Sequence, residues 1–282
     1  MKNIFVIPNP QKDEGYTVTT EACKTIKACG GTVFMLNKYS ESKIDCKYSE
    51  DYPTDAELIL VIGGDGSFID ASVYAIEHNV PILGINMGKV GYLSEIAPDN
   101  LEKLKDIFCG GYRIEEKLLL STSITKNGDI AIIPRLAVND VVVSHALYIG
   151  ISDFVVYSND GGIRYRADGA VISTPAGSTA YSLSSGGPIV SHGADAIIVT
   201  PIAPHSFFNR SIVFGANETI KIKNTGQSAM NVTVDGRLCA VIESAEKCTV
   251  TASDKKIKVL TFKDNNMFSN LFSKMQILED II

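Results

Sequence analysis

The fold of this chain is decided by the stretch Leu58-Ile59-Leu60-Val61-Ile62-Gly63-Gly64-Asp65-Gly66-Ser67. Its first five residues form a continuous apolar run, which is typical of a parallel strand buried on both faces. The glycines that follow allow positive φ angles and close approach of a ligand to the backbone. Residues 68–78 then have a helical pattern, and the first N–H groups of a helix bind anions. The stretch therefore predicts a strand, a turn and a helix arranged around a phosphate group.

Asp65 is an unusual residue for such a turn, because an acidic side chain repels an anion. Beside a phosphate it can act as a base that removes a proton from a hydroxyl group, or as a ligand for the Mg²⁺ that accompanies the phosphate. The alternative is a purely conformational role, since aspartate is frequent in turns. The glycine spacing matches neither a dinucleotide-binding Rossmann turn nor a P-loop with its lysine, which disfavours an ordinary dehydrogenase and a P-loop enzyme.

The first 110 residues alternate between short apolar runs and segments with helical spacing. Such alternation predicts an α/β domain over residues 1–110, with a Rossmann-like parallel sheet that binds ligands at the carboxyl ends of its strands. The polar stretch 39–54 is expected to be a mobile surface loop. The expected strands are residues 4–7, 32–36, 58–62 and 81–85, and the expected helices are residues 17–29, 68–78 and 100–108.

After Gly110-Gly111 the chain changes to many short β-branched runs separated by turn pairs such as Asn127-Gly128 and Asp160-Gly161. This pattern predicts an all-β, sandwich-like domain over residues 111–263, and Asp235-Gly236 is expected to form a hairpin turn within it. Apolar residues at helical spacing predict an amphipathic C-terminal helix over residues 264–282, packed on the body. The expected strands are residues 118–125, 130–143, 149–157, 170–173, 196–199, 212–214, 219–222, 231–234 and 256–262.

Composition excludes several classes of protein. The 282 residues are 45% hydrophobic, which is enough for a full core, and the formal net charge of −6 argues against a nucleic-acid or anionic-membrane surface. No apolar run is long enough to span a bilayer, and the short apolar start does not resemble a secretory signal, so we expect a cytoplasmic protein. The six cysteines include no Cys-x-x-Cys pair, so we expect reduced thiols and no metal site made of protein ligands.

Two motifs give the chain a family resemblance. Gly63-Gly64-Asp65-Gly66 resembles the signature of the superfamily that contains NAD kinases, 6-phosphofructokinases and diacylglycerol-type lipid kinases. Residues 173–181 read Ser-Thr-Pro-Ala-Gly-Ser-Thr-Ala-Tyr and, with residues 184–188, closely resemble the long NAD kinase signature. Asn139-Asp140, Arg166-Ala167-Asp168-Gly169 and residues 200–206 follow in the family's order. The chain is thereby identified as a member of the NAD kinase family.

The resemblance implies a kinase that uses ATP, or inorganic polyphosphate, with Mg²⁺ or another divalent cation to phosphorylate the adenosine-ribose 2′-hydroxyl of NAD⁺, producing NADP⁺. It makes Asp65 the catalytic base and gives donor-phosphate binding to Gly63, Gly64, Gly66 and Ser67. It also implies a homodimer or homotetramer. The NAD-binding residues that it implies are Asp65, Gly66, Phe68, Asn139, Asp140, Arg166, Asp168, Thr179, Ala180, Tyr181 and Ser184.

Individual roles follow from side-chain chemistry together with the resemblance. Asn139 can both donate to and accept from an adenine edge, and Asp140 can accept from ribose hydroxyl groups. Tyr181 can stack on adenine. By resemblance, Thr179 binds the base and Ser184 reaches the nicotinamide amide, while Asp168, often supplied by a neighbouring subunit, contacts the nicotinamide end.

Local alternatives remain beside these roles. Asn139-Asp140 can be a turn pair between strands, the residues of the long motif can be loop residues, and Arg164 with Arg166 can belong to a structural salt bridge. Two other functions are compatible with the glycine turn: a lipid or sugar kinase of the same superfamily, and a non-catalytic NAD(P) sensor. The sequence departs from the family at Asp140, where glutamate is usual, at Ala176, where threonine is common, and over residues 88–93.

Overall fold

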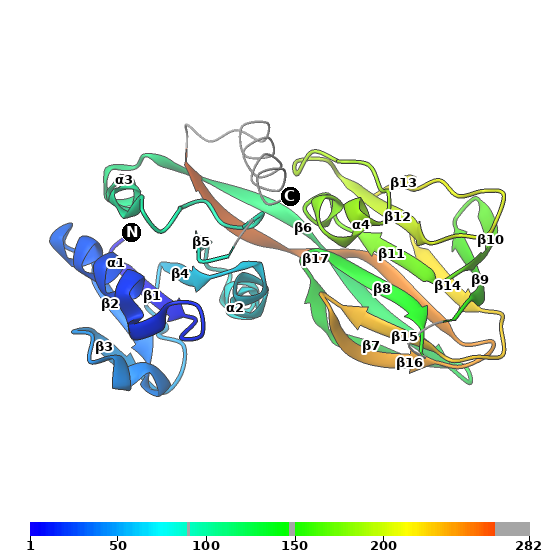
Figure 1. Cartoon of the computed structure of the whole chain (residues 1–282), viewed down its shortest axis with the longest axis horizontal. Helices are drawn as coiled ribbons and strands as arrows, with labels where there is room; N and C mark the ends of the chain where they lie inside the picture. Colours follow the sequence, from blue (N-terminus) through cyan, green and yellow to red (C-terminus); the bar gives the residue numbers. More distant parts are fainter. Residues whose placement is uncertain (89–90, 147–149, 263–282) are drawn as a thin grey trace. The chain divides into compact units, whose positions relative to one another are not determined.

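The structure is a computed structural model that describes residues 1–88, 91–146 and 150–262 (Figure 1). The chain divides into two compact units: the first contains residues 1–116 and the described residues after 256, and the second contains residues 117–256. The sequence placed the divisions at residues 110 and 263 instead. The positions differ because β6 (Tyr112–Lys126) and β17 (Lys247–Phe262) are long strands that continue through both division points.

Three sequence expectations fall partly or wholly outside the described residues. They are the C-terminal helix over 264–282, the start of the expected strand at residue 149, and Lys89 with Val90 in the segment 88–93.

The first unit is built on a parallel sheet with the strand order β5-β4-β1-β2-β3. β4 lies inside this sheet, between β5 and β1, and its five apolar side chains are at most 1% exposed. A strand covered on both faces needs such a continuous apolar run, so the predicted Rossmann-like α/β architecture is confirmed. The strands are β1 (Asn3–Pro8), β2 (Thr32–Leu36), β3 (Lys47–Ser49), β4 (Leu58–Gly63) and β5 (Ile82–Asn86).

The helices of the first unit follow the predicted positions, with one informative difference. α2 (Asp65–His78) begins at Asp65 rather than at Phe68, because Gly64 is extended and caps it, and an acidic residue is favourable in the first turn. α2 packs against β4 and β5, and α1 (Thr17–Ala28) packs against β2. The remaining elements are η1 (Glu14–Tyr16), η2 (Asn37–Ser42), η3 (Leu101–Leu104) and α3 (Lys105–Cys109).

The expected surface loop over residues 39–54 is instead partly structured. It contains most of η2 and the whole of β3, which pairs in parallel with β2. Tyr39, Ile44 and Tyr52 are buried, and the ring of Tyr52 stacks on His78. The prediction was wrong because a few apolar side chains within a polar stretch are enough to anchor it to the sheet.

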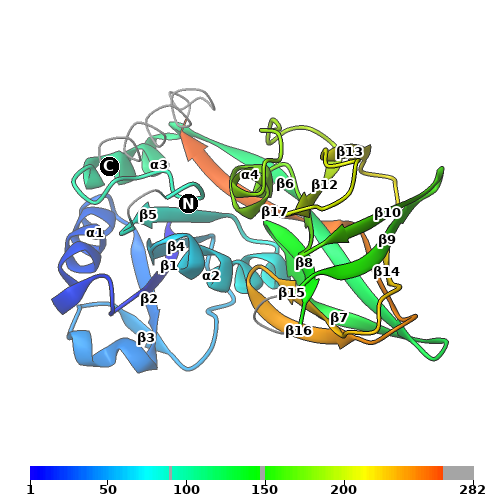
Figure 2. The same cartoon turned by 45° about the vertical axis from the view of Figure 1, so that its right-hand side comes forward.

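The second unit contains a six-stranded antiparallel sheet with the order β13-β12-β11-β8-β15-β16. Further strands form antiparallel pairs, in the order β10-β9-β14-β17 and in the hairpin of β6 with β7 (Figure 2). The bounds are β7 (Asp129–Ala137), β8 (Asp140–His145), β9 (Ser152–Ser158), β10 (Gly161–Ala167), β11 (Gly169–Ser173), β12 (Ala196–Ile202), β13 (Ile212–Gly215), β14 (Ile220–Asn224), β15 (Met230–Val234) and β16 (Arg237–Ile242), with η4 (Gly177–Thr179) and α4 (Tyr181–Ser184).

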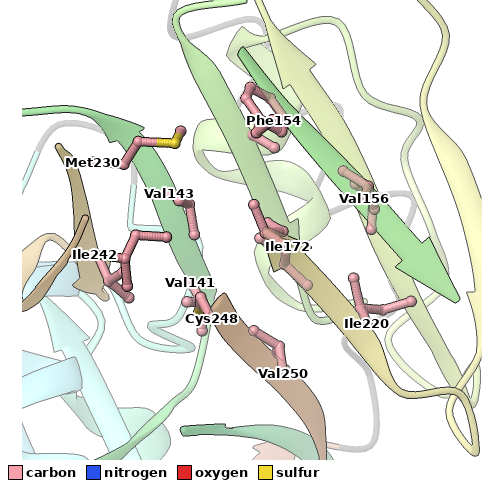
Figure 3. Close-up of a cluster of buried hydrophobic side chains, with 14 of the residues drawn as sticks. Val141, Val143, Phe154, Val156, Ile172, Ile220, Met230, Ile242, Cys248 and Val250 are labelled. Atoms are coloured by element: carbon pink, nitrogen blue, oxygen red, sulfur yellow. The ribbon is translucent and has the colours of Figure 1, made fainter. Parts of the chain in front are cut away.

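A single hydrophobic core joins these strands. Val141 and Ile172 come from the six-stranded sheet, and Val156, Ile220 and Val250 come from the other strands (Figure 3). All five are at most 4% exposed. The predicted sandwich-like β domain is therefore confirmed. The sequence did not predict β10 and β16 as strands, because β10 opens with two glycines and β16 carries exposed polar and apolar residues at the edge of its sheet.

The turns behave as their residue types predict. Asn127 and Gly128 both have positive φ, 48° and 94°, and so do Asp235 and Gly236, 48° and 75°. Each pair joins two antiparallel strands, as two-residue turns with positive φ do. Within the described residues, none of the helices has the length and apolar character needed to cross a membrane.

Candidate active site

In the first unit, three neighbouring parallel strands, β1, β4 and β5, end beside one another. The N–H of Asn9, just after β1, donates to the carbonyl oxygen of Ile62 at 2.8 Å, and the N–H of Met87 donates to that of Gly63 at 2.8 Å. The side chain of Asn9 also donates to Oγ of Ser67 at 2.8 Å. The glycine turn is thus held from both sides at the edge where such sheets bind ligands.

Asp65 lies in the first turn of α2 and is half-buried. Its two carboxylate oxygens accept N–H groups from Tyr92 and Leu93, each at 3.0 Å. A carboxylate has about four acceptor positions, so two remain for a ligand. The backbone therefore orients the acid and leaves it able to accept a proton or bind a cation.

Gly91 makes this arrangement possible, and the sequence reasoning did not identify it. Its φ is +65°, and a Cβ atom at this position would clash with the side chain of Asn86. Glycine alone satisfies both conditions, and the turn delivers the N–H groups of Tyr92 and Leu93 to Asp65. Burial, and next the charge of Asp65, raise the pKa of the Tyr92 phenol. The only signal in the sequence was that Gly91 lies in the segment 88–93, where the chain departs from the family pattern.

The glycines of the turn serve different purposes. A Cβ atom on Gly63 would lie 2.5 Å from Cβ and Oγ of Ser67, so this glycine is needed for packing. A Cβ atom on Gly66 would meet nothing within 4 Å, so the space beside it is open. Phe68, predicted to bind NAD, is only 1% exposed and packs toward Gly84 of β5, so its side chain supports the turn from behind.

In the second unit, Asn139 and Asp140 are held by Asp235, which the sequence predicted only as part of a hairpin turn. The carboxylate of Asp235 accepts the N–H groups of Val138, Asn139 and Asp140 at 2.9, 2.8 and 3.1 Å. The N–H of Asp235 in turn donates to the carbonyl oxygen of Asp140 at 2.9 Å. Asp235 therefore forms the predicted hairpin turn and also fixes the backbone of the Asn139-Asp140 pair.

The Asn139-Asp140 pair combines a carboxyl group of raised pKa with a buried acceptor that has no partner among the described residues. Asp140 is 6% exposed, and burial, followed by the nearby Asp235 carboxylate, raises its pKa to about 7. Burial also raises the pKa of Asp235, against the opposing effect of its three N–H donors and of Arg135. Oδ1 of Asn139 is buried and has no hydrogen-bond partner among the described residues. A buried acceptor of this kind calls for a donor from elsewhere, which a turn pair between strands does not explain.

The long motif packs directly on Asn139. Oγ1 of Thr174 donates to the carbonyl oxygen of Val138 at 2.7 Å, and the N–H of Thr174 donates to that of Asn139 at 2.9 Å. Gly177 must be glycine, because a Cβ atom there would overlap the backbone of Asn139. The motif and the Asn139-Asp140 pair therefore form one structural element, which explains the glycine that the sequence reasoning left unassigned.

The predicted base-binding residues differ in exposure. Tyr181 is 45% exposed, so a face of its ring is available for stacking. Ser184 is exposed, and Ala180 is half-buried. Thr179 is buried, and its hydroxyl donates to the carbonyl oxygen of Ala176 at 3.1 Å, so it can offer a ligand only its acceptor positions.

Arg166 and Asp168 lie at the junction of β10 and β11. Arg166 is exposed, its N–H donates to Oγ of Ser206 at 2.9 Å, and its carbonyl oxygen accepts the N–H of His205. Asp168 is half-buried, and its backbone bonds to Ile202 and His145. None of the ion pairs within the described chain includes Arg164 or Arg166, so the structural salt-bridge alternative has no support there.

The predicted residues thus form one group in the first unit and two in the second. Gly63, Gly64, Asp65, Gly66, Ser67 and Phe68 lie together where α2 begins. Asn139 and Asp140 pack with the long motif at one end of β11, whereas Arg166 and Asp168 lie at its other end. Among the residues that the structure describes, no three His, Cys, Asp or Glu side chains gather in a group that could hold a metal ion.

Comparison with known proteins agrees with these features. Residues 4–112 match the ATP-NAD kinase N-terminal domain, and residues 138–262 match the ATP-NAD kinase C-terminal domain. An NAD kinase from Lachnoclostridium phytofermentans is 32% identical over 97% of this chain and 99% of its own length. One from Acetivibrio thermocellus is 34% identical over 98% of this chain and 97% of its own length.

Solved structures share the fold. Yeast NADH kinase, solved with NADH, superposes with a TM-score of 0.84 at 20% identity, covering 98% of this chain and 88% of its own. An NAD kinase from Archaeoglobus fulgidus, solved with ATP, gives a TM-score of 0.72 at 23% identity, covering 98% of this chain and 99% of its own. The family matches over both units and the two full-length relatives show that the chain belongs to the ATP-NAD kinase family.

Proposed function

We propose that the chain is an NAD kinase that transfers a phosphoryl group from ATP to the adenosine-ribose 2′-hydroxyl of NAD⁺, producing NADP⁺. The observation that carries the proposal is the Asp65 carboxylate, which two backbone N–H groups orient beside an open glycine turn. The relatives support the choice of substrates, since one solved structure contains NADH and another contains ATP. The reaction is a phosphoryl transfer between two nucleotides.

Asp65 has the role of the base in this proposal. A ribose hydroxyl is a weak acid, so it attacks a phosphoryl group faster when a positioned acceptor takes its proton. The N–H groups of Tyr92 and Leu93 fix the carboxylate in one orientation. Gly63, Gly64, Gly66 and Ser67 lie at the N-terminus of α2, where N–H groups favour the donor phosphates.

The second unit has the groups for recognising NAD⁺. The orphaned Oδ1 of Asn139 needs a donor such as the amino group of adenine, and Asp140 can accept from ribose hydroxyls. The exposed ring of Tyr181 can stack on the base, with Thr179 and Ala180 beside it in the motif. Ser184, Arg166 and Asp168 are assigned to the nicotinamide end of the dinucleotide.

Magnesium enters this proposal with the donor, as MgATP. The cation would neutralise part of the phosphate charge, which a protein of net charge −6 otherwise opposes. Asp65 is the one carboxylate in the glycine turn Gly63 to Ser67, so a metal that remains bound to phosphate oxygens suits this site better than one held by a protein cage.

The test is whether the purified protein forms NADP⁺ from NAD⁺, ATP and Mg²⁺. A coupled NADP⁺-specific dehydrogenase monitors the product. Inorganic polyphosphate as an alternative donor and NADH as an alternative acceptor define the substrate range. No transfer with any donor would overturn the proposal. Tight NAD⁺ binding without transfer would indicate a sensor, and turnover of a lipid or a sugar would indicate another kinase of the superfamily.

Two further properties are proposed on the basis of the family. The protein is a homodimer or homotetramer in which Asp168 contacts NAD bound to a neighbouring copy, and light scattering would test this, because a monomeric active enzyme contradicts it. The proposed compartment is the cytoplasm, which is consistent with all six cysteines being free thiols.

A further inference from the structure

The chain segment after β1 forms a rigid turn beside the glycine stretch. The carbonyl oxygen of Asn9 accepts the N–H groups of Lys12 and Asp13 at 3.0 and 2.9 Å, and its side-chain oxygen accepts that of Gln11 at 3.0 Å. Beyond the turn, the carboxylate of Asp13 accepts two N–H groups at the start of α1. The backbone on both sides of Lys12 is thus fixed by hydrogen bonds. The turn therefore determines where the Lys12 side chain begins, unlike that of a lysine on a flexible surface loop.

The ammonium group of Lys12 lies on bare backbone at the ends of two strands. A Cβ atom on Gly64 would overlap Nζ of Lys12, and one on Gly88 would lie 3.6 Å from it. Gly64 follows β4, and Gly88 follows β5, which is the neighbour of β4 in the sheet (Figure 1). Lys12, from the end of β1, therefore completes a group of three neighbouring strand ends.

This placement is electrostatically unfavourable for an isolated lysine. Gly64 is the N-cap of α2, and the N-terminus of a helix carries a partial positive charge, which repels an ammonium group. No ion pair formed within the described residues includes Lys12, so no carboxylate neutralises the ammonium group by direct contact. Asp65 is directed instead at the N–H groups of Tyr92 and Leu93. An anion bound between the ammonium group and the helix would turn the repulsion into attraction.

We propose that Lys12 binds the terminal phosphates of the nucleoside triphosphate donor. The inference rests on the proposed function and adds a donor-specific residue to it. Lysine suits this role because its compact charge can follow a phosphate from ground state to transition state without a fixed planar geometry. Because Nζ of Lys12 lies beside Gly64, which is assigned to the donor phosphates, we expect its effect to fall on the donor.

The experiment compares Lys12→Gln and Lys12→Arg with a matched control, Lys24→Gln. Lys24 is also an exposed lysine of the first unit, but it pairs only with Glu21 on the surface of α1. We expect the KM for ATP to rise about tenfold to a hundredfold in Lys12→Gln, since a charge-assisted contact is lost. The KM for NAD⁺ should stay within about twofold, Lys12→Arg should recover part of the loss, and Lys24→Gln should match the wild type.

A second measurement separates this inference from the proposed function. Calorimetric titration of the protein with inorganic triphosphate and Mg²⁺ needs no turnover, and thermal unfolding confirms that the variants fold. Weaker triphosphate binding by Lys12→Gln than by the wild type supports the role of Lys12, whether or not NADP⁺ is formed. Equal binding, an unchanged KM for ATP, or an equal rise in the KM for NAD⁺ overturns it.

Discussion

Asp65 in the first unit and Asp235 in the second make a direct comparison, because each carboxylate accepts backbone N–H groups and each is followed by a glycine. Asp65 accepts two N–H groups from the distant residues Tyr92 and Leu93. Asp235 accepts three, all from the run Val138 to Asp140. Of about four acceptor positions, Asp65 keeps two free and Asp235 keeps one.

The difference shows how one side chain type serves two purposes. The backbone holds Asp65, which remains open to a ligand, whereas Asp235 holds the backbone, and its carboxylate is largely occupied in doing so. We therefore assign chemistry to Asp65 and the positioning of Asn139 and Asp140 to Asp235. Each of the following predictions tests one side of this contrast.

The largest expected effect is that of Asp65→Asn. The amide cannot take up a proton, so we expect kcat to fall by about 10³-fold, which is within the usual range for loss of a general base. The Kd for NAD⁺, measured by calorimetry, should change by only a few-fold, since most of the residues assigned to NAD⁺ are in the second unit. Asp160→Asn, an exposed aspartate in a hairpin turn, is the control. Retention of normal kcat by Asp65→Asn would remove Asp65 as the base.

Asp235→Asn should have the next largest effect, of a different kind. One amide oxygen cannot satisfy three N–H donors, so we expect a loss of about 1 to 3 kcal/mol in the free energy of unfolding. Because Asn139 and Asp140 then lose their fixed positions, the KM for NAD⁺ should rise about tenfold, while the KM for ATP stays near that of the wild type. Denaturant titration and steady-state kinetics measure the two effects. A loss of stability with an unchanged KM for NAD⁺ would reduce Asp235 to a purely structural residue.

This contrast also marks what the sequence can predict. The apolar run Leu58 to Ile62 and the glycines after it identified a buried interior strand and the turn, because residue types indicate burial and backbone freedom. The roles of Gly91 and Asp235 were not predictable in this way. Their partners are far away in the sequence: Asp235 accepts N–H groups from residues nearly a hundred positions earlier, and backbone donors have no side-chain signature.

The charge state of Asp140 gives a third prediction. Its pKa is raised to about 7 in the folded protein, so between about pH 4 and pH 7 the unfolded chain releases a proton that the folded protein keeps, and the free energy of unfolding falls as the pH rises. Asp140→Asn removes this loss. Without ligand, the variant should gain about 2 to 4 kcal/mol relative to the wild type between pH 4 and pH 8. Urea titration across this range measures the gain, and a pH-independent difference would contradict the raised pKa.

The smallest expected effects come from the glycines that follow the two aspartates. Gly236 has φ +75°, so Gly236→Ala should lose about 1 kcal/mol of stability through backbone strain, with little change in kinetics. Gly66 has open space and no left-handed φ, so Gly66→Ala should keep or slightly raise the Tm. If donor phosphates bind against the bare backbone beside Asp65, the methyl group that Gly66→Ala introduces should still raise the KM for ATP several-fold. Unchanged kinetics in Gly66→Ala would show that the donor does not bind in the space beside Asp65. Asp65 could then no longer be described as a ligand-facing aspartate, in contrast to the scaffolding Asp235.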